Sequence, residues 1–245
     1  MVYIVGIGPG SREYMLVKTI EILEKSDIII GFKRAIESIA FIKDKNRILV
    51  KTLKEILDII NNNADKSISI VASGDPCFYG ISDYINRNYK GELITVPGIS
   101  SFQYFMAKLN KSWQEAYLGS LHGREENFIE KVKDYKISIW LTDKVNSPEK
   151  ICKRLFKEKL SVKVYIGENL SYDDERILIG KPEEFIHREF YPMTNSCNTP
   201  PSKGGDNSST SLDNLSKLVG STNSQQVRFI DDLAVVVIEN EIHKG

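Results

Sequence analysis

Short apolar runs alternate with longer amphipathic segments through the first hundred residues of the chain. The apolar runs predict strands, and segments with apolar residues three or four positions apart predict helices. Strands are expected at residues 2–5, 27–30, 48–50, 68–72 and 93–96, and helices at residues 15–24, 56–60, 81–85 and 102–109. Strands separated by helices need crossover connections, so this part is expected to form a mostly parallel sheet covered on both faces.

A second series of elements begins near Trp113. Strands are expected at residues 117–118, 137–141, 162–167, 176–179 and 233–238, and helices at residues 125–133, 150–157 and 182–186. The strands at 176–179 and 233–238 are expected to pair antiparallel, which makes the second sheet mixed. The simplest architecture is therefore two α/β domains, residues 1–112 and 113–245, joined near residues 110–116.

One stretch departs from this alternation. Residues 191–227 are dense in Ser, Asn, Thr, Gly and Pro and contain few large apolar residues. Such a composition buries too little surface to offset the entropy of ordering it, so we expect a disordered insert. Residues 212–218 within it have a helical pattern. Its role is open between a substrate lid and a tolerated insertion.

Charge, cysteine and histidine usage narrows the function classes. Lysine plus arginine balance aspartate plus glutamate at 33 each, which gives no reason to expect nucleic acid as a partner. No apolar run approaches the roughly 20 residues that span a bilayer, and the amino terminus lacks a signal-peptide pattern. The three cysteines and three histidines fall at no metal-ligand spacing. We therefore expect a cytoplasmic protein with reduced thiols and no protein-bound metal.

Three glycine-containing loops follow predicted strands of the first series. They read GIGPG at residues 6–10, SGDPCFYG at 73–80 and PGISS at 97–101. Each has an ordinary explanation: a tight turn, an Asp-Pro helix start, and serines that cap a helix. Carboxyl ends of parallel strands share one sheet edge, where α/β proteins bind ligands. The three loops together therefore predict one binding site.

A dinucleotide site is the obvious alternative for the first loop. That motif requires glycine at position 11 and an acidic residue at the end of the second strand. Ser11 and Gly31 stand at those positions, and Pro9 removes an amide that could bind phosphate. These residues disfavour a dinucleotide-binding fold.

The three loops together resemble the successive motifs of the tetrapyrrole methylase family, over residues 1–190 and again over 229–240. The resemblance implies two α/β domains, a mostly parallel and a mixed sheet, with S-adenosylmethionine in the cleft between them, and a homodimer. It implies that the methionine and ribose ends of this cofactor contact Gly8, Pro9, Ser73, Gly74, Asp75, Phe78, Ser100 and Ser101. It places Leu141 and Leu170 around the adenine.

Further segments resemble one branch of this family, whose members methylate carbon 5 of a corrin precursor. They are SWQEA at residues 112–116, SLHGR at 120–124, LTD at 141–143 and ENLSY at 168–172. The resemblance implies a cobalt-precorrin substrate, with His122 and Arg124 facing it. Arginine offers a bidentate fork to the carboxylates of such a ring, and His122 is either an acid or base or a binding group. The ordinary alternative is a capped turn and a solvated arginine.

Other readings stay open. Lys33 and Arg34 fit either the same anion-binding face or a solvated helix start, and Tyr172 and Asp173 fit either the cleft border or a turn. Within the family, the substrate could be another precorrin carbon, uroporphyrinogen, diphthine or a ribosomal ribose; the neutral charge argues against RNA. A nucleotide-binding module without catalysis is the alternative from another class.

Overall fold

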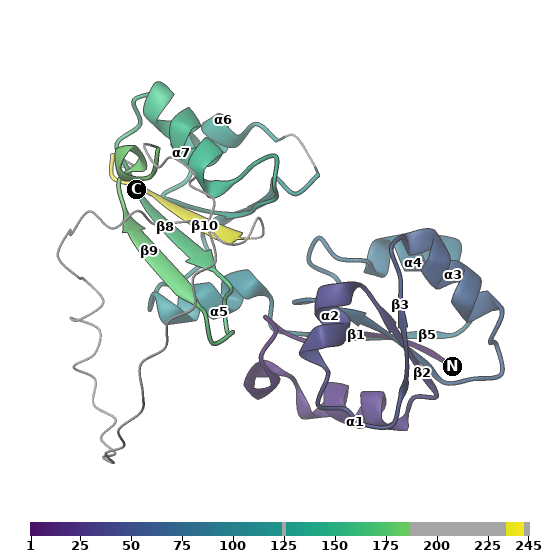
Figure 1. Cartoon of the computed structure of the whole chain (residues 1–245). Coiled ribbons are helices and arrows are strands. Elements are labelled where there is room, and N and C mark those ends of the chain that lie inside the picture. Colours follow the sequence, from purple (N-terminus) through teal and green to yellow (C-terminus); the bar gives the residue numbers. More distant parts are fainter. Residues whose placement is uncertain (124–125, 187–233, 243–245) are drawn as a thin grey trace, which may run out of the picture. The chain divides into compact units, whose positions relative to one another are not determined.

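A computed structural model describes residues 1–123, 126–186 and 234–242 of the chain (Figure 1). The first series of elements forms a sheet of five parallel strands in the order β3-β2-β4-β1-β5. The strands are β1 Val2–Gly6, β2 Ile28–Gly31, β3 Asn46–Leu49, β4 Ile68–Ala72 and β5 Leu93–Val96. The connections contain η1 Arg12–Tyr14, α1 Val17–Lys25, α2 Lys33–Ser38, α3 Leu53–Asn61 and α4 Ser82–Asn88.

Alternate residues of the central strands enter two separate apolar clusters, as the two-residue period of a strand requires. Val5 and Val71 pack with residues of α1 and α2 on one face. Ile4 and Ile70 pack with residues of α3 and α4 on the other face. The prediction of a parallel sheet covered on both faces is confirmed.

The second series forms a mixed sheet in the order β6-β7-β10-β8-β9. Its strands are β6 Tyr117–Ser120, β7 Ile137–Leu141, β8 Val162–Glu168, β9 Arg176–Gly180 and β10 Ala234–Asn240. Only β6 and β7 pair in parallel; every other pair in this sheet is antiparallel. The helical segments of this part are α6 Phe128–Asp134, α7 Pro148–Lys157 and η2 Pro182–Phe185.

The expected pairing of the strands at 176–179 and 233–238 is wrong. β10 lies between β7 and β8, so that Val236 is opposite both Trp140 and Ile166, while β9 is at the edge of the sheet. Residues Ala234–Ile238 are all buried, whereas every residue of β9 is at least partly exposed. A continuous apolar run is typical of a strand buried on both faces, and this signal in 233–238 indicates a central strand.

Helix α5, Ser101–Lys108, follows the last strand of the first sheet but packs against the second. Phe105 and Met106 are fully buried in a cluster that contains Ile139, Tyr165 and Val237. Both sheets belong to one compact unit. The division into domains at residues 112 and 113 stays a prediction, and the insert expected at 191–227, with its helical pattern at 212–218, lies outside the described residues.

Candidate active site

The three glycine-containing loops follow three neighbouring strands. In the sheet order, β1 lies between β4 and β5, and one loop leaves the carboxyl end of each. The N–H of Ile7 donates to the carbonyl of Ala72 at 3.0 Å. Gly8 and Gly74 exchange two backbone hydrogen bonds, at 3.3 and 2.7 Å, and form an isolated antiparallel bridge beyond the parallel pairing of β1 and β4. The loops therefore meet at one sheet edge, as expected.

Backbone packing explains why these loops contain glycine. A Cβ atom on Gly98 would lie 2.2 Å from the carbonyl oxygen of Gly74, and one on Gly6 would lie 2.6 Å from the amide nitrogen of Gly98. Gly74 also has a φ of +66°, a conformation in which side chains are strained. One glycine from each loop thus permits the three backbones to touch.

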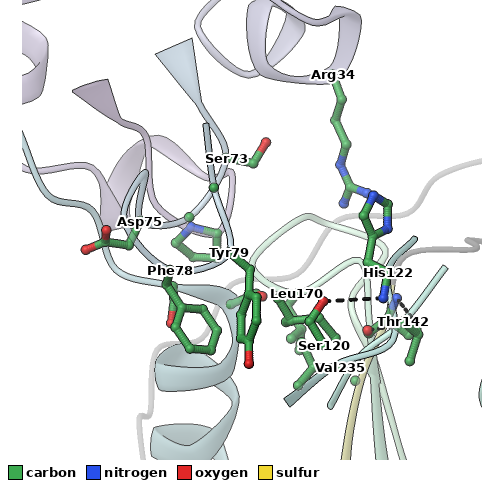
Figure 2. Close-up of a pocket in the computed structure, with 18 residues that line it drawn as sticks. Arg34, Ser73, Asp75, Phe78, Tyr79, Ser120, His122, Thr142, Leu170 and Val235 are labelled. Atoms are coloured by element: carbon green, nitrogen blue, oxygen red, sulfur yellow. Dashed lines mark hydrogen bonds between the residues drawn. The ribbon is translucent and has the colours of Figure 1, made fainter. Parts of the chain in front are cut away.

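A pocket of about 310 Å³ opens beside these loops (Figure 2). That volume lies within the range of small-molecule sites. From the first series it is lined by Pro9, Arg34, Ser73, Gly74, Asp75, Phe78, Tyr79, Gly80, Ser100 and Ser101, and from the second by Ser120, His122, Leu141, Thr142, Gly167, Leu170, Ala234 and Val235. Every predicted cofactor residue except Gly8 lines it, and Gly8 pairs with Gly74 behind it. The structure brings these residues together; their binding roles stay predictions.

Ser100 supplies a buried polar group to this pocket. It is the N-cap of α5, and its backbone N–H donates to Oε1 of Gln103 at 2.9 Å. Its buried hydroxyl oxygen faces the N–H of Gln103 in a capping box, and its proton has no acceptor in the part of the chain that the structure describes. An unsatisfied buried hydroxyl costs about 1–3 kcal/mol, so a ligand atom that bonds to it is favoured.

Asp75 has a structural role beside any contact with a ligand. Its Oδ1 accepts a hydrogen bond from the N–H of Cys77 at 2.7 Å, which fixes the turn at Pro76 and Cys77. In Figure 2 its carboxylate points away from the side of the pocket at which Ser120, His122 and Thr142 lie. The helix-start alternative is wrong, because residues 76–81 form turns and bends and α4 begins only at Ser82.

Because one carboxylate oxygen of Asp75 is engaged in this turn, Asp75→Ala is expected to weaken cofactor binding only moderately, by about tenfold. That factor corresponds to one hydrogen bond of about 1–1.5 kcal/mol. Asp75→Asn retains the acceptor oxygen and is expected to stay within about threefold of the wild type on the same grounds. Calorimetric titration with S-adenosylmethionine measures both; unchanged affinity in Asp75→Ala would contradict the expectation.

The segment Ser120–Gly123 is held by several hydrogen bonds. The N–H of His122 donates to Oγ of Ser120 at 3.3 Å, and the N–H of Gly123 donates to Oδ2 of Asp143 at 2.7 Å. Burial raises the pKa of Asp143, but the N–H groups of Asn146 and Gly123 outweigh it and leave that pKa below its usual range. Asp143 therefore remains a carboxylate that anchors the turn carrying His122.

Three other predicted residues have different outcomes. Arg124 lies outside the described residues, so its role stays a prediction. Lys33 is a solvated side chain, 82% exposed, whose ammonium group lies 3.8 Å from Glu37. Its neighbour Arg34 instead lines the pocket. The structure thus separates two cations that the sequence could not distinguish.

Sequence reasoning missed several pocket residues. Tyr79 lies in the loop after β4 with a φ of +51°, which is strained for a bulky residue, and its hydroxyl donates to the carbonyl of Leu118 at 3.2 Å. Thr142 joins β7 to β10: its hydroxyl donates to the carbonyl of Ala234 at 2.8 Å and accepts from the Ala234 N–H at 2.9 Å. The available signals were the neighbouring Phe78 for Tyr79 and Leu141 for Thr142.

Glu175 joins α5 to the loop that follows β8. Its Oε2 accepts from the hydroxyl of Tyr104 at 2.6 Å and from the N–H of Ser171 at 2.7 Å, and Lys108 lies 3.3 Å from Oε1. Burial raises the pKa of Glu175, but these donors outweigh it and hold the pKa below its usual range. Burial and the same contact raise the pKa of Tyr104.

A depressed folded-state pKa stabilises the protein at a pH above the unfolded-state value, about 4.3 for glutamate, and this contribution is lost as the pH falls through the folded-state pKa. We expect Glu175→Gln to be less stable than the wild type by about 1–2 kcal/mol at pH 7. The difference should shrink steadily between about pH 5 and 3. Urea unfolding across that range checks it, and a difference that does not depend on pH would argue against an ionised Glu175.

The fold and the pocket agree with a comparison to known families. Residues 1–186 match the family described as Tetrapyrrole (Corrin/Porphyrin) Methylases, and the chain belongs to this family. It is therefore a tetrapyrrole methylase, and the family resemblance and the fold class predicted from the sequence are confirmed. This family uses S-adenosylmethionine as methyl donor.

The chain is similar to individual members of this family in sequence and in structure. The chain is 35% identical over 204 residues, 79% of its length, to a probable cobalt-precorrin-7 C(5)-methyltransferase of Methanocaldococcus jannaschii, of which it covers 95%. The crystal structure of precorrin-6Y methylase from Archaeoglobus fulgidus matches with a TM-score of 0.66 and 21% identity, over 99% of both chains. That of uroporphyrin-III C-methyl transferase from Thermus thermophilus, complexed with S-adenyl homocysteine, matches with a TM-score of 0.66, 16% identity and coverage of 97% and 96%.

The described residues contain neither a metal-binding cluster nor a membrane-spanning helix. Within residues 1–123, 126–186 and 234–242, no three His, Cys, Asp or Glu side chains cluster in a way that could hold a metal ion. Among the same residues, no helix has both the length and the apolar character needed to cross a membrane.

Proposed function

We propose that the chain transfers a methyl group from S-adenosylmethionine to carbon 5 of cobalt-precorrin-6B, which gives cobalt-precorrin-7. The observation that supports S-adenosylmethionine as methyl donor is that the three glycine-containing loops bring the predicted cofactor residues into one pocket. Support for the carbon comes from the Methanocaldococcus jannaschii relative, which is named for carbon 5, and from the SLHGR and ENLSY segments of this chain.

The residues present fit the methyl donor. The buried hydroxyl of Ser100, whose proton has no acceptor in the described chain, can donate to a polar atom of the ligand. Gly74 lines the pocket without a side chain, so its backbone is open to the ligand. Leu141, Leu170 and Val235 give an apolar wall on the other side, suited to the flat adenine. The fold of the Thermus thermophilus enzyme, which was crystallised with S-adenyl homocysteine, is the same.

S-adenosylmethionine supplies a methyl group on a positively charged sulfur, which becomes neutral when the methyl group moves to a nucleophilic carbon. The chain's own part is alignment and exclusion of water, which together can lower a barrier by up to about 7–11 kcal/mol. The apolar side chains of Phe78, Leu141 and Leu170 line the pocket, and we expect them to keep water from the bound methyl donor. His122 lines the pocket, so its imidazole can hold a substrate group or take up a proton from it. Arg124 is proposed to bind a substrate carboxylate.

The proposal is tested by incubating the protein with S-adenosylmethionine labelled in its methyl group and with cobalt-precorrin-6B, and by locating the label by NMR. We expect label at carbon 5. Label at another carbon would favour a different methylase of the family, such as one acting on a different precorrin position or on uroporphyrinogen. Binding of S-adenosylmethionine without transfer to any tetrapyrrole would favour a nucleotide-binding module.

Three finer points belong to the same proposal. We expect a homodimer, a cytoplasmic location and no metal bound by the protein itself, all on the family resemblance and the composition. Light scattering during size-exclusion chromatography tests the first, and metal analysis of the purified protein tests the third. A monomer, or a stoichiometric metal, would contradict them separately.

A further inference from the structure

Arg34 lines the pocket but is not one of the residues predicted to contact the cofactor. It lies in the first turn of α2, just after the carboxyl end of β2, and lines the pocket. In Figure 2 its side chain extends from the helix toward the side of the pocket at which His122 lies, away from Asp75 and Phe78. The same residue also borders a second hollow, which is lined by Ser38 and Tyr172 among others.

The ring of Tyr172 packs against the guanidinium of Arg34. The guanidinium carbon lies 5.0 Å from the centre of the Tyr172 ring, within the range of a cation–π contact. The hydroxyl of Tyr172 shares a hydrogen bond of 2.8 Å with the hydroxyl of Ser38, and Ser38 lies 2.9 Å from the carbonyl oxygen of Arg34, to which it can donate. The ring is therefore tied to the helix that carries the arginine.

The first glycine-containing loop makes room for this ring. A Cβ atom on Gly10 would lie 2.2 Å from Cζ of Tyr172, so the ring rests directly on the backbone there. The next residue, Ser11, donates its N–H to Oγ of Ser171 at 3.0 Å. The orientation of the Arg34 guanidinium is thus fixed by segments far apart in the sequence. They are Gly10, Ser38 and the turn at 171–172.

We infer that Arg34 binds a carboxylate of the corrin precursor and that Tyr172 is a positioning residue for it; this inference rests on the proposed function. A planar guanidinium donates two parallel hydrogen bonds to a carboxylate, and holding the guanidinium in place reduces the entropy lost on binding. His122 lies on the same side of the pocket, so the carboxylate meets two hydrogen-bonding groups there.

Arg34→Gln tests the binding role. We expect the KM for cobalt-precorrin-6B to rise by about 10- to 100-fold, the usual effect of losing a charged hydrogen-bond donor, with kcat within a few-fold of the wild type. The affinity for S-adenosylmethionine, measured by calorimetry, should not change. Binding of the precursor in the absence of S-adenosylmethionine, followed by its absorbance, should weaken by the same factor. Lys33→Gln removes the same charge from the adjacent solvated position and should leave all four quantities unchanged.

Tyr172 is tested through its coupling to Arg34. Tyr172→Leu is expected to raise the same KM by about 3- to 10-fold, since it removes the cation–π contact, whereas Tyr172→Phe keeps the ring and should restore most of the affinity. In the Arg34→Gln background, Tyr172→Leu should have no further effect on KM, because a positioning residue acts only through its partner.

The outcomes separate the inference from the proposed function. If the wild-type protein methylates no tetrapyrrole, the proposed function fails. If the wild type is active and Arg34→Gln keeps its KM, the binding role is wrong. Weaker S-adenosylmethionine binding in Arg34→Gln would make Arg34 a cofactor contact and overturn the inference. Additive effects of Arg34→Gln and Tyr172→Leu would overturn the positioning role.

Discussion

Replacement of Gly98 by alanine is expected to destabilise the fold by about 3 kcal/mol and to weaken S-adenosylmethionine binding by about 100-fold or more. The added Cβ would lie 2.2 Å from the carbonyl oxygen of Gly74 and 2.9 Å from the carbonyl carbon of Gly6. Both neighbours are backbone atoms, and Gly74 is fixed by its two hydrogen bonds to Gly8. The loops must therefore separate, and the pocket residues move with them.

Gly91→Ala is the matched control. Its Cβ would lie equally close to a neighbour, 2.3 Å, but that neighbour is the hydroxyl at the end of the Tyr89 side chain. A side chain can turn away, so we expect a loss of at most about 1 kcal/mol and normal cofactor affinity. Urea unfolding and calorimetry compare the two variants. Equal effects in both would show that backbone contact among the loops does not shape the pocket.

Phe105→Ala is expected to lower the free energy of unfolding by about 3–5 kcal/mol, the usual effect of deleting a buried aromatic ring. Phe105 is fully buried in α5, and a Cβ on Gly167 would lie 3.1 Å from its ring. Because α5 begins beside Ser100 and Ser101 while Gly167 also lines the pocket, the cavity would loosen both sides of the site. We therefore also expect weaker cofactor binding in the folded fraction.

Phe156→Ala provides the comparison, since that ring on α7 is 51% exposed. Its loss should cost less than about 1 kcal/mol. Thermal unfolding distinguishes the two variants, and binding is measured well below the transition. A small effect in Phe105→Ala would mean that α5 is not the structural link between the two sheets.

Three strands could be predicted with the bounds that the structure gives them. Residues 68–72, 93–96 and 137–141 were expected as strands and form β4, β5 and β7 with the same bounds. In β4 and β7 the apolar run matches inner residues that are buried, whereas β5 lies at the edge of its sheet and was found from its β-branched residues. Strand order is different, because it depends on partners far away in the chain. The position of β10 inside the second sheet was missed for this reason.

The candidate site likewise has features that could be predicted from the sequence and features that could not. Loops that follow parallel strands could be placed at one edge from the sequence, since strand direction alone determines where they lie. The left-handed backbone conformation of Tyr79 could not be predicted, because nothing in the residues around it specifies a positive φ. Nor could the stacking of Arg34 on Tyr172, which needs the three-dimensional approach of two segments distant in sequence.

The position of β10 has a consequence for synthesis. β7 and β8 are each hydrogen-bonded to β10 and not to each other, so neither acquires this neighbour until residues 234–240 have left the ribosome. The first sheet can form long before residues 234–240 are synthesised, because all its strands lie within the first 96 residues. A nascent chain therefore carries two open strand edges for the last part of translation, a state in which strands of different molecules can pair. Ala234 and Val235 complete the pocket in the same final step.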